Sequence, residues 1–251
     1  MSLTTQRSHD YALLLQSWRK LAARVGLKIS RLATVDGLSV FYITTPSTRW
    51  DTRERIYLSA GVHGDEPAPP WGLLNWAQTN TKLFSKHRFL IFPCFNPHGL
   101  MNNTRMDQRG VDINRTFHDG REPLIAAWEK TLKGRRISLA ICLHEDYDAQ
   151  GCYVYELTSR KDDAGSRILR DCAAIIPTDP RRSIDGRRMK KGHFLRRIAP
   201  NLPGMPEAVQ LYKLGAPVSL TFESPSEFSL IDRVAAQKRF ITSALHHVLG
   251  I

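Results

Sequence analysis

Apolar residues near the N-terminus recur every three to four positions, the period of an amphipathic helix. The residues that share this spacing are Tyr11, Leu14, Leu15, Trp18, Leu21, Ala22 and Val25. Ser8 or Asp10 can cap the start of such a helix, because their side-chain oxygens accept from free backbone N–H groups, and Gly26 can end it. The sequence therefore predicts a helix over residues 11–25.

Two strand-like runs follow, Leu27–Val35 and Leu38–Thr44, joined by Asp36-Gly37. Asp-Gly between two hydrophobic runs is a strong signal for a β-hairpin. A polar loop, Pro46–Arg55, separates this hairpin from an apolar strand at Ile56–Ala60.

From there, helical and strand patterns alternate. The predicted helices are Pro69–Gln78, Pro123–Leu132, Gly165–Ile176 and Leu230–Leu249, and the predicted strands are Arg88–Pro93, Ile137–Leu143 and Val218–Phe222. This alternation predicts an α/β fold with a mixed, mostly parallel central sheet and helices on both faces, preceded by the N-terminal helix and hairpin. We expect a single domain over residues 1–251. Two stretches, Phe95–Arg121 and Pro177–Gly215, are too long for simple connections and are expected to carry function.

Composition narrows the class of protein. The 251 residues are 42% hydrophobic and 24% charged, as in ordinary globular proteins. Cys94, Cys142, Cys152 and Cys172 are widely spaced, which favours reduced core thiols over a disulfide framework. No apolar run is long enough to span a membrane and the N-terminus lacks a signal-peptide core, so we expect a cytoplasmic protein. The formal net charge of +12 suggests an acidic partner, either an anionic substrate or nucleic acid.

Titratable residues follow several predicted strands. His63 and Glu66 come after Ile56–Ala60, His144 after Ile137–Leu143, and Glu223 after Val218–Phe222. In open α/β sheets, ligands bind beyond the carboxyl ends of the strands, so these side chains should converge at one edge.

This pattern predicts a zinc site made of His63, Glu66 and His144. Catalytic zinc takes three protein ligands and one open position, and two histidines with one glutamate form a known set. The alternative for His144 is a histidine that binds no metal and is satisfied by local hydrogen bonds, which is the usual case for a lone histidine. His98, His118 and His193 are rivals as ligands, His98 above all, although it follows an Asn-Pro turn rather than a strand.

Further residues fit catalysis and substrate binding. Glu223 suits a general base, although it could instead be a helix-capping or surface carboxylate. Arg105 could stabilise an oxyanion, although it could instead be an exposed arginine without a role in the site. Asn114 beside Arg115 could receive a carboxylate, which guanidinium grips in a bidentate manner. Asp146, near His144, could support one of the ligands.

These motifs resemble those of the zinc carboxypeptidases of the carboxypeptidase A type. The resemblance runs from about Ile56 to the C-terminus. It rests on the following segments: His63-Gly64-Asp65-Glu66, Asn96-Pro97-X-Gly99, Gly110-Val111-Asp112-Ile113-Asn114-Arg115-X-Phe117, His144 after a strand, and Thr221-Phe222-Glu223. It implies that one Zn²⁺ per chain is bound by His63, Glu66 and His144. It further implies that Glu223 is the base and later proton donor, that Arg105 polarises the scissile carbonyl, and that Asn114 and Arg115 bind the terminal carboxylate.

The chain also departs from the family pattern. His98 stands where family members usually have Asp, and the tyrosine that often precedes the catalytic glutamate has only Tyr212 as a nearby counterpart. The segments His144–Asp148 and Tyr153–Glu156 resemble a bacterial subgroup that includes murein-peptide amidases. They also resemble succinylglutamate desuccinylase and aspartoacylase, which usually carry an additional C-terminal β domain.

Paired basic residues recur in the second long stretch: Arg181-Arg182, Arg187-Arg188, Lys190-Lys191 and Arg196-Arg197. Such runs are usually solvated, but beside an active site they could recruit acidic or cell-wall-type peptides. Nucleic acid is disfavoured, because only Phe194 is available among them for base stacking.

The sequence thus predicts a zinc metallocarboxypeptidase-like hydrolase. Its partner would be a peptide or acyl-amino-acid substrate with a free carboxylate, attacked by zinc-bound water with help from Glu223. The alternatives are an N-acyl amino-acid deacylase with the same zinc site and a non-catalytic basic binding protein on the same scaffold.

Overall fold

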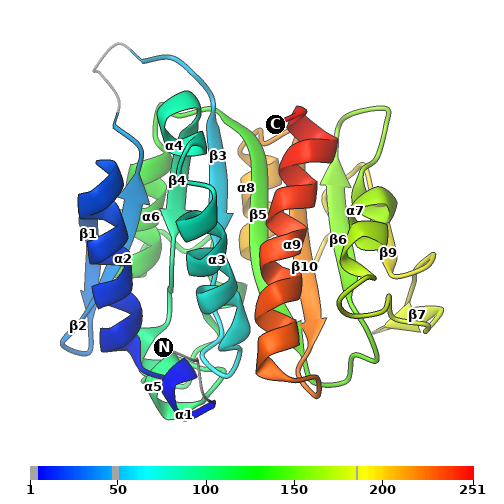
Figure 1. Ribbon diagram of the computed structural model, residues 1–251, viewed down its shortest axis with the longest axis horizontal. Coiled ribbons are helices and arrows are strands. Elements are labelled where there is room, and N and C mark those ends of the chain that lie inside the picture. Colours follow the sequence, from blue (N-terminus) through cyan, green and yellow to red (C-terminus); the bar gives the residue numbers. More distant parts are fainter. Residues whose placement is uncertain (1–4, 47–50, 185) are drawn as a thin grey trace.

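The structure, a computed structural model, describes residues 5–46, 51–184 and 186–251. The predicted loop Pro46–Arg55 therefore lies partly outside the described residues. Over the described residues, an eight-stranded sheet has the order β1-β2-β4-β3-β5-β10-β6-β9, and β7 pairs with β8 separately (Figure 1). The strands are β1 Lys28–Val35, β2 Leu38–Thr44, β3 Arg55–Ser59, β4 Arg88–Phe92, β5 Ile137–Asp146, β6 Tyr153–Thr158, β7 Ser183–Ile184, β8 Arg187–Arg188, β9 His193–Arg196 and β10 Val218–Pro225.

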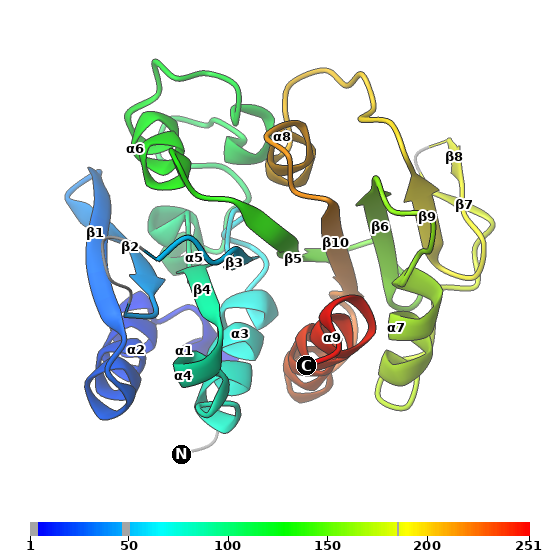
Figure 2. The same ribbon diagram turned by 90° about the horizontal axis from the view of Figure 1, so that it is seen from above.

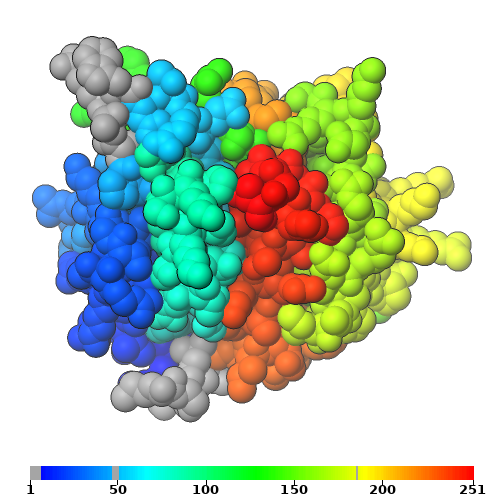
Figure 3. Space-filling model, turned by 45° about the horizontal axis from the view of Figure 1, so that its top comes forward, coloured from blue at the N-terminus to red at the C-terminus, as the bar shows by residue number. Residues whose placement is uncertain are grey.

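Helices cover both faces of this sheet. They are α1 Thr5–Ser8, α2 Tyr11–Val25, α3 Ala68–Thr79, α4 Leu83–Lys86, α5 Pro97–Asn102, α6 Pro123–Leu132, α7 Gly165–Cys172, α8 Glu207–Lys213 and α9 Leu230–Leu249, with a 3₁₀ turn at Ile113–Arg115. Figure 2 shows α2, α3, α9 and α7 below the sheet and α6 and α8 above it. On the surface in Figure 3, the first group forms neighbouring blue, teal, red and yellow-green bands. The predicted α/β fold with helices on both faces is confirmed.

The centre of the sheet is parallel. β4, β3, β5 and β10 run in one direction, whereas β1–β2, β2–β4 and β10–β6 pair in antiparallel fashion. The carboxyl ends of the central strands therefore meet at one edge, as the alternation in the sequence predicts.

Local signals explain the N-terminal elements. Asp10 caps α2 by accepting from the Leu13 N–H at 2.8 Å, and Gly26 ends it with φ of 72°. Asp36 and Gly37 both have positive φ, 50° and 72°, which is the conformation that a two-residue hairpin turn requires. Both predictions are confirmed.

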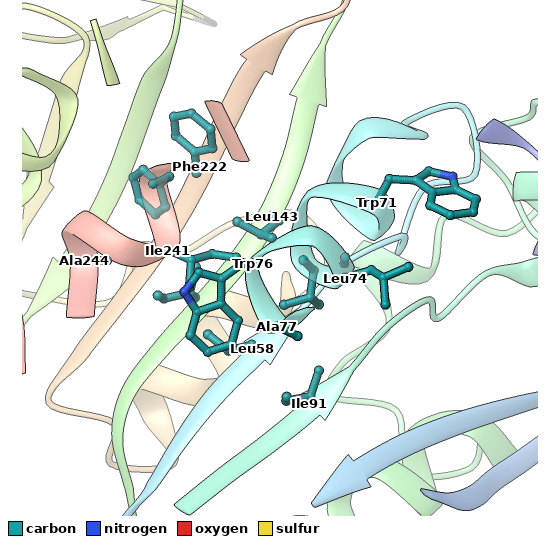
Figure 4. Close-up of a cluster of buried hydrophobic side chains, with 14 of the residues drawn as sticks. Leu58, Trp71, Leu74, Trp76, Ala77, Ile91, Leu143, Phe222, Ile241 and Ala244 are labelled. Atoms are coloured by element: carbon teal, nitrogen blue, oxygen red, sulfur yellow. The ribbon is translucent and has the colours of Figure 1, made fainter. Parts of the chain in front are cut away.

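Large apolar side chains fill the layer between the sheet and the helices α3 and α9. Figure 4 shows Leu58, Leu143 and Phe222 from three central strands facing Trp76 of α3 and Ile241 of α9. Phe222 and Phe240 stack with ring centroids 4.2 Å apart. All four cysteines are buried and none forms a disulfide, as predicted. No helix among the described residues is long and apolar enough to cross a membrane.

Several predicted boundaries are wrong, and two of the errors concern the site. β5 continues to Asp146 and β10 to Pro225, so His144 and Glu223 lie within strands rather than after them. The long stretch Pro177–Gly215 is partly regular, because it contains β7, β8, β9 and α8, and the predicted helix Gly165–Ile176 ends at Cys172. In the other long stretch, Phe95–Arg121, α5 and the 3₁₀ turn form.

Two glycines allow the turn after β3 to approach the turn after β4. A Cβ atom on Gly64 would lie 1.9 Å from the carbonyl carbon of Gly99. Asn96 holds the second turn, because its Oδ1 accepts from the Gly99 N–H at 2.8 Å and its Nδ2 donates to the Arg105 and Met106 carbonyls. This contact brings the segment of Arg105 up to His63.

We expect Gly64→Ala to lower the free energy of unfolding by about 3 kcal/mol, the upper end for overpacking, because the atoms in the way belong to the backbone. Gly120→Ala is the control, since its Cβ would meet only the movable Glu129 Oε2 at 3.2 Å. Urea denaturation of the two variants measures the difference, and equal stabilities would contradict the close approach.

Candidate active site

One cavity of about 450 Å³ opens at the carboxyl ends of the central strands. Seven residues predicted from the sequence to form the site line it together: His63, Glu66, Arg105, Asn114, Arg115, His144 and Glu223. They come from the turn after β3, from the stretch between β4 and α6, and from β5 and β10. The convergence expected from the strand order is present.

His63, Glu66 and His144 form a cluster whose ligand atoms all lie within 4.8 Å of one another. His63 Nδ1 is 2.5 Å from Glu66 Oε1, and His144 Nδ1 is 3.0 Å from Glu66 Oε2. The two Nδ1 atoms therefore flank one carboxylate. A divalent cation could lie between these three groups and bind all of them, in place of the contacts that they make with one another.

Glu66 provides a test of whether these residues fit a metal. Each of the three side chains is 4% exposed, and the contact of Glu66 Oε2 with His144 Nδ1 at 3.0 Å lacks the geometry of a hydrogen bond. A buried carboxylate oxygen without a hydrogen bond is costly unless a cation meets it. Two imidazole nitrogens and one carboxylate oxygen are also the donor set that zinc accepts. The residues present fit a zinc ion.

The pKa values of the three clustered side chains are shifted by burial and by the charges that they exert on one another. Burial alone would lower the pKa of His63, but Glu66 and the hydrogen bonds to Asp112 and Glu66 raise it to about 9. Burial would raise the pKa of Glu66, yet the two histidines hold it at about 2. The pKa of His144 is raised, mainly by Glu66 against the effect of burial. Metal binding to such histidines has to displace protons.

Asp112 orients His63 from the far side of the imidazole ring. His63 Nε2 is 3.2 Å from Asp112 Oδ1, while Asp112 Oδ2 accepts from Arg105 Nη2 at 2.9 Å. Although burial opposes it, the hydrogen bond from His63 keeps the pKa of Asp112 well below its usual range. A carboxylate on the second nitrogen of a ligand histidine fixes its tautomer and orientation.

Asp146, which the sequence offered as a support for one of the ligands without indicating which, has other partners. Asp146 Oδ2 accepts from the Tyr153 hydroxyl at 2.8 Å and lies 3.6 Å from Arg181. It contacts neither ligand histidine in any described hydrogen bond or ion pair. Asp112 could have been found in the sequence, because it precedes Asn114 by two residues in the motif already selected.

Glu223 stands directly opposite His144, since the two are paired in the parallel β5–β10 ladder. Burial raises the pKa of Glu223 to about 8; His144 opposes this shift, and Glu66 and Asp146 add to it. A general base is most effective when its pKa is close to the working pH.

Arg105 reaches the cluster of His63, Glu66 and His144 from the loop after α5. Its Nη1 lies 3.2 Å from His63 Nδ1 and 3.9 Å from Glu66 Oε1. The guanidinium is held in place by Asp112, so its charge faces the ligand atoms of the cluster.

Asn114 and Arg115 line the cavity next to the start of α8. Asn114 Oδ1 accepts from the Glu207 N–H at 2.9 Å, which leaves Nδ2 of Asn114 as a donor. Glu207 is itself buried and accepts hydrogen bonds from Tyr57 and, at 2.9 Å, from Ser59. This acid was not identified from the sequence; it ties α8 to β3 beneath the site.

The rival histidines lie elsewhere. His98 pairs with Asp36 at 3.1 Å, His118 is exposed, and His193 lies 2.8 Å from Glu156. None of the three lines the cavity. Tyr212 does not line it either, and its hydroxyl donates to the Arg197 carbonyl.

A second group of possible metal ligands, Glu156, Asp163 and His193, lies between β6, β9 and α7. Glu156 accepts from the Ala164 and Gly165 N–H groups at the start of α7 and lies 2.8 Å from His193 Nε2. These contacts account for Glu156 as a residue that holds the start of α7.

The catalytic domain of the succinylglutamate desuccinylase/aspartoacylase family matches residues 52–138. None of the curated proteins matches the chain. A candidate metallopeptidase of Shewanella amazonensis is 20% identical, with a TM-score of 0.85 over 96% of this chain and 94% of its own.

Two further solved structures are metallo-carboxypeptidases. That of Burkholderia cenocepacia is 16% identical, with a TM-score of 0.70 over 98% of this chain and 69% of its own. That of Pseudomonas aeruginosa, in complex with (2-guanidinoethylmercapto)succinic acid, is 16% identical, with a TM-score of 0.61 over 90% of this chain and 67% of its own.

The chain has the metallo-carboxypeptidase fold. The resemblance to the zinc carboxypeptidases that the sequence motifs indicated is therefore confirmed for the fold. The range of this chain that matches the catalytic-domain family, residues 52–138, includes His63, Glu66, Arg105 and Asp112.

We expect Asp112→Asn to weaken zinc binding by about 10- to 100-fold, because the amide is a poorer partner for His63 than the carboxylate. Competition with a chromophoric chelator measures the affinity. Asp146→Asn is the matched control, with a smaller effect. An unchanged affinity in Asp112→Asn would show that Asp112 does not support His63.

Proposed function

We propose that the protein is a zinc-dependent hydrolase that cleaves an amide bond next to a free carboxylate, most simply as a metallocarboxypeptidase acting on a peptide. The observation that carries the proposal is the convergence of His63, Glu66 and His144 in one cavity with Glu223 opposite His144. The metallo-carboxypeptidase fold supports it.

Zinc bound by these three residues would act as a Lewis acid that lowers the pKa of a coordinated water and polarises a carbonyl oxygen. His63 and His144 would bind through Nδ1, the atoms that face Glu66. Asp112 would hold the His63 ring in the orientation that binding needs.

Glu223 would accept a proton from the attacking water and return it to the leaving amine. Burial and the neighbouring acids raise the pKa of Glu223 in the metal-free protein, and a zinc ion beside it would lower this pKa again, which would leave the carboxylate free to accept the proton near neutral pH. The pairing of Glu223 with His144 in neighbouring strands keeps the carboxylate beside the cluster and limits its movement.

Arg105 would stabilise the negative charge that develops on the carbonyl oxygen. Its guanidinium is already fixed by Asp112, so little reorganisation is needed when the charge appears. Removal of one such donor typically costs about 10²- to 10³-fold in rate.

Asn114 and Arg115 would bind the carboxylate next to the scissile amide. The amide of Asn114 presents Nδ2 because Oδ1 is engaged by Glu207. Arg115 Nη1 donates to the Asn114 carbonyl at 3.1 Å, which leaves its remaining N–H groups for a ligand.

A second candidate function uses the same groups. The match of residues 52–138 to the succinylglutamate desuccinylase/aspartoacylase catalytic domain favours an N-acyl amino-acid deacylase. Both reactions hydrolyse an amide beside a carboxylate, so they differ in the acyl part of the substrate. Rates on blocked dipeptides and on N-acyl amino acids with the same terminal residue separate them.

We expect Glu223→Gln to lower kcat on the better of these substrates by about 10²- to 10⁴-fold, because the amide cannot take the proton. Zinc content should stay that of the wild type, since Glu223 is not a ligand. Glu227→Gln, an exposed carboxylate on the same segment, is the control.

Unchanged turnover in Glu223→Gln would refute its role as the base. If the wild type with bound zinc hydrolyses neither substrate class but binds polyanions in a salt-sensitive way, a basic binding protein would replace the hydrolase.

A further inference from the structure

Helix α9 carries two polar side chains, one helical turn apart, that face the ends of β5 and β10. Gln237 is fully buried, and the side chain of Arg233 is only 12% exposed. Residues four positions apart lie on the same face of a helix, so both project from one stripe of α9. Neither belongs to the metal cluster, to the proposed base or to the proposed receptor for a carboxylate.

Gln237 holds the ends of two central strands together. Its Nε2 donates to the His144 carbonyl at 2.7 Å and to the Ser224 hydroxyl at 2.8 Å. β3 pairs with β5 only as far as Cys142, so His144 lies two residues beyond the end of that ladder. The Gln237 amide therefore ties the ligand residue His144 to the residue that follows Glu223.

Arg233 acts on the segment of Glu66 through a buried acid. Arg233 Nη1 donates to Glu145 Oε1 at 2.6 Å, and Glu145 Oε2 accepts from the Ala68 N–H at 2.9 Å. Ala68 begins α3 and follows Glu66 by two residues, while Glu145 directly follows His144. The Glu145 carboxylate thus connects the two segments that carry Glu66 and His144, and Arg233 fixes this carboxylate from α9.

Close packing of α3 against α9 limits the movement of these contacts. A Cβ atom on Gly72 of α3 would lie 2.4 Å from the Cβ of Gln237 and 3.2 Å from the Val234 carbonyl oxygen. Figures 1 and 2 show the two helices side by side on the same face of the sheet. Closely packed interiors transmit strain, so the position of α9 is passed on to the strand ends that it contacts.

Stability alone is a poor explanation for the two polar residues. Gln237 Oε1 and Arg233 Nε are buried and have no hydrogen-bond partner among the described residues. A buried polar atom without a partner costs free energy, and an apolar side chain would fill the same space without that cost. The ion pair of Arg233 with Glu145 is also weak evidence for stability, because desolvation offsets the attraction of buried charges.

We propose that Arg233 and Gln237 are positioning residues, which set the geometry of the zinc ligands from α9 without being ligands themselves. Arg233 acts through the carboxylate of Glu145, and Gln237 acts through the carbonyl of His144. The proposal rests on the zinc site of the proposed function. Groups that orient metal ligands typically change metal affinity by about 10- to 100-fold when they are removed.

Zinc affinity and the visible spectrum of the cobalt-loaded protein test the positioning. Co²⁺ can replace zinc, and its absorption reports the geometry of the ligands. We expect Gln237→Met, which keeps the shape of the side chain but not the amide, to bind zinc about 10-fold more weakly in competition with a chromophoric chelator and to shift the cobalt spectrum. Arg233→Lys, which keeps the charge but not the planar fork, should change both in the same direction and serves if Gln237→Met does not fold.

Ser243→Ala is the matched control. This buried side chain lies on α9 as well, but it donates to Asp171 of α7 at 2.7 Å, so its loss should leave zinc affinity and the cobalt spectrum unchanged. Hydrogen exchange of the metal-free protein gives a second measurement that needs no metal. We expect Gln237→Met to increase amide exchange in residues 144–146 and 223–226, and Ser243→Ala to increase it in α7 instead.

Wild-type zinc affinity and an unchanged cobalt spectrum in Gln237→Met would overturn the positioning role. An equal change in Ser243→Ala would overturn it too, because the effect would then be a general loss of stability. A wild type that binds neither metal would reject the proposed function. In that case hydrogen exchange decides the positioning: increased exchange at the two strand ends in Gln237→Met would support it, and wild-type exchange there would overturn it.

Discussion

A carboxylate enclosed by two histidines is the interaction on which the rest of this site depends. Glu66 is buried against the Nδ1 atoms of His63 and His144, and one of its oxygens lacks a hydrogen bond among the described residues. Three buried titratable groups at such short range are unfavourable unless protons or a cation compensate them. The surrounding contacts can be understood as ways of holding this cluster together.

Its supports come from distant parts of the chain. The parallel pairing of β5 with β10 sets His144 opposite Glu223, and the close contact of Gly64 with Gly99 brings His63 to the loop that carries Arg105. Asp112 joins the two groups, because it contacts both His63 and Arg105. In the proposed mechanism, this one carboxylate would therefore support both a metal ligand and the arginine that stabilises the developing charge.

The sequence predicted those features that depend on local or periodic signals. The α2 helix and the first hairpin have their own caps and turn residues, and His63 and Glu66 follow an apolar strand within a few positions. Parallel central strands then bring His144 and Glu223 to the same edge, so the candidate site could be predicted without coordinates.

The remaining features depend on contacts between residues far apart in sequence. The Asp112–His63 contact joins residues 49 positions apart, and the Glu207–Tyr57 contact joins residues 150 positions apart. β9 is only four residues long and lies between basic pairs, so this part of the sequence resembled a loop. Its pairing with β6 is what brings Arg196 to the cavity. The strand β6 could have been predicted, since Tyr153-Val154-Tyr155 has high β-propensity.

The central claim is that the buried cluster binds zinc. Elemental analysis of the purified protein, before and after addition of zinc and removal of the excess, tests it most directly, with His63→Ala and His98→Ala measured in parallel. We expect about one zinc per chain in the wild type and in His98→Ala, whose histidine pairs with Asp36 outside the cavity, and almost none in His63→Ala. A wild-type protein that retains no zinc, or a His63→Ala variant that retains all of it, would contradict the account.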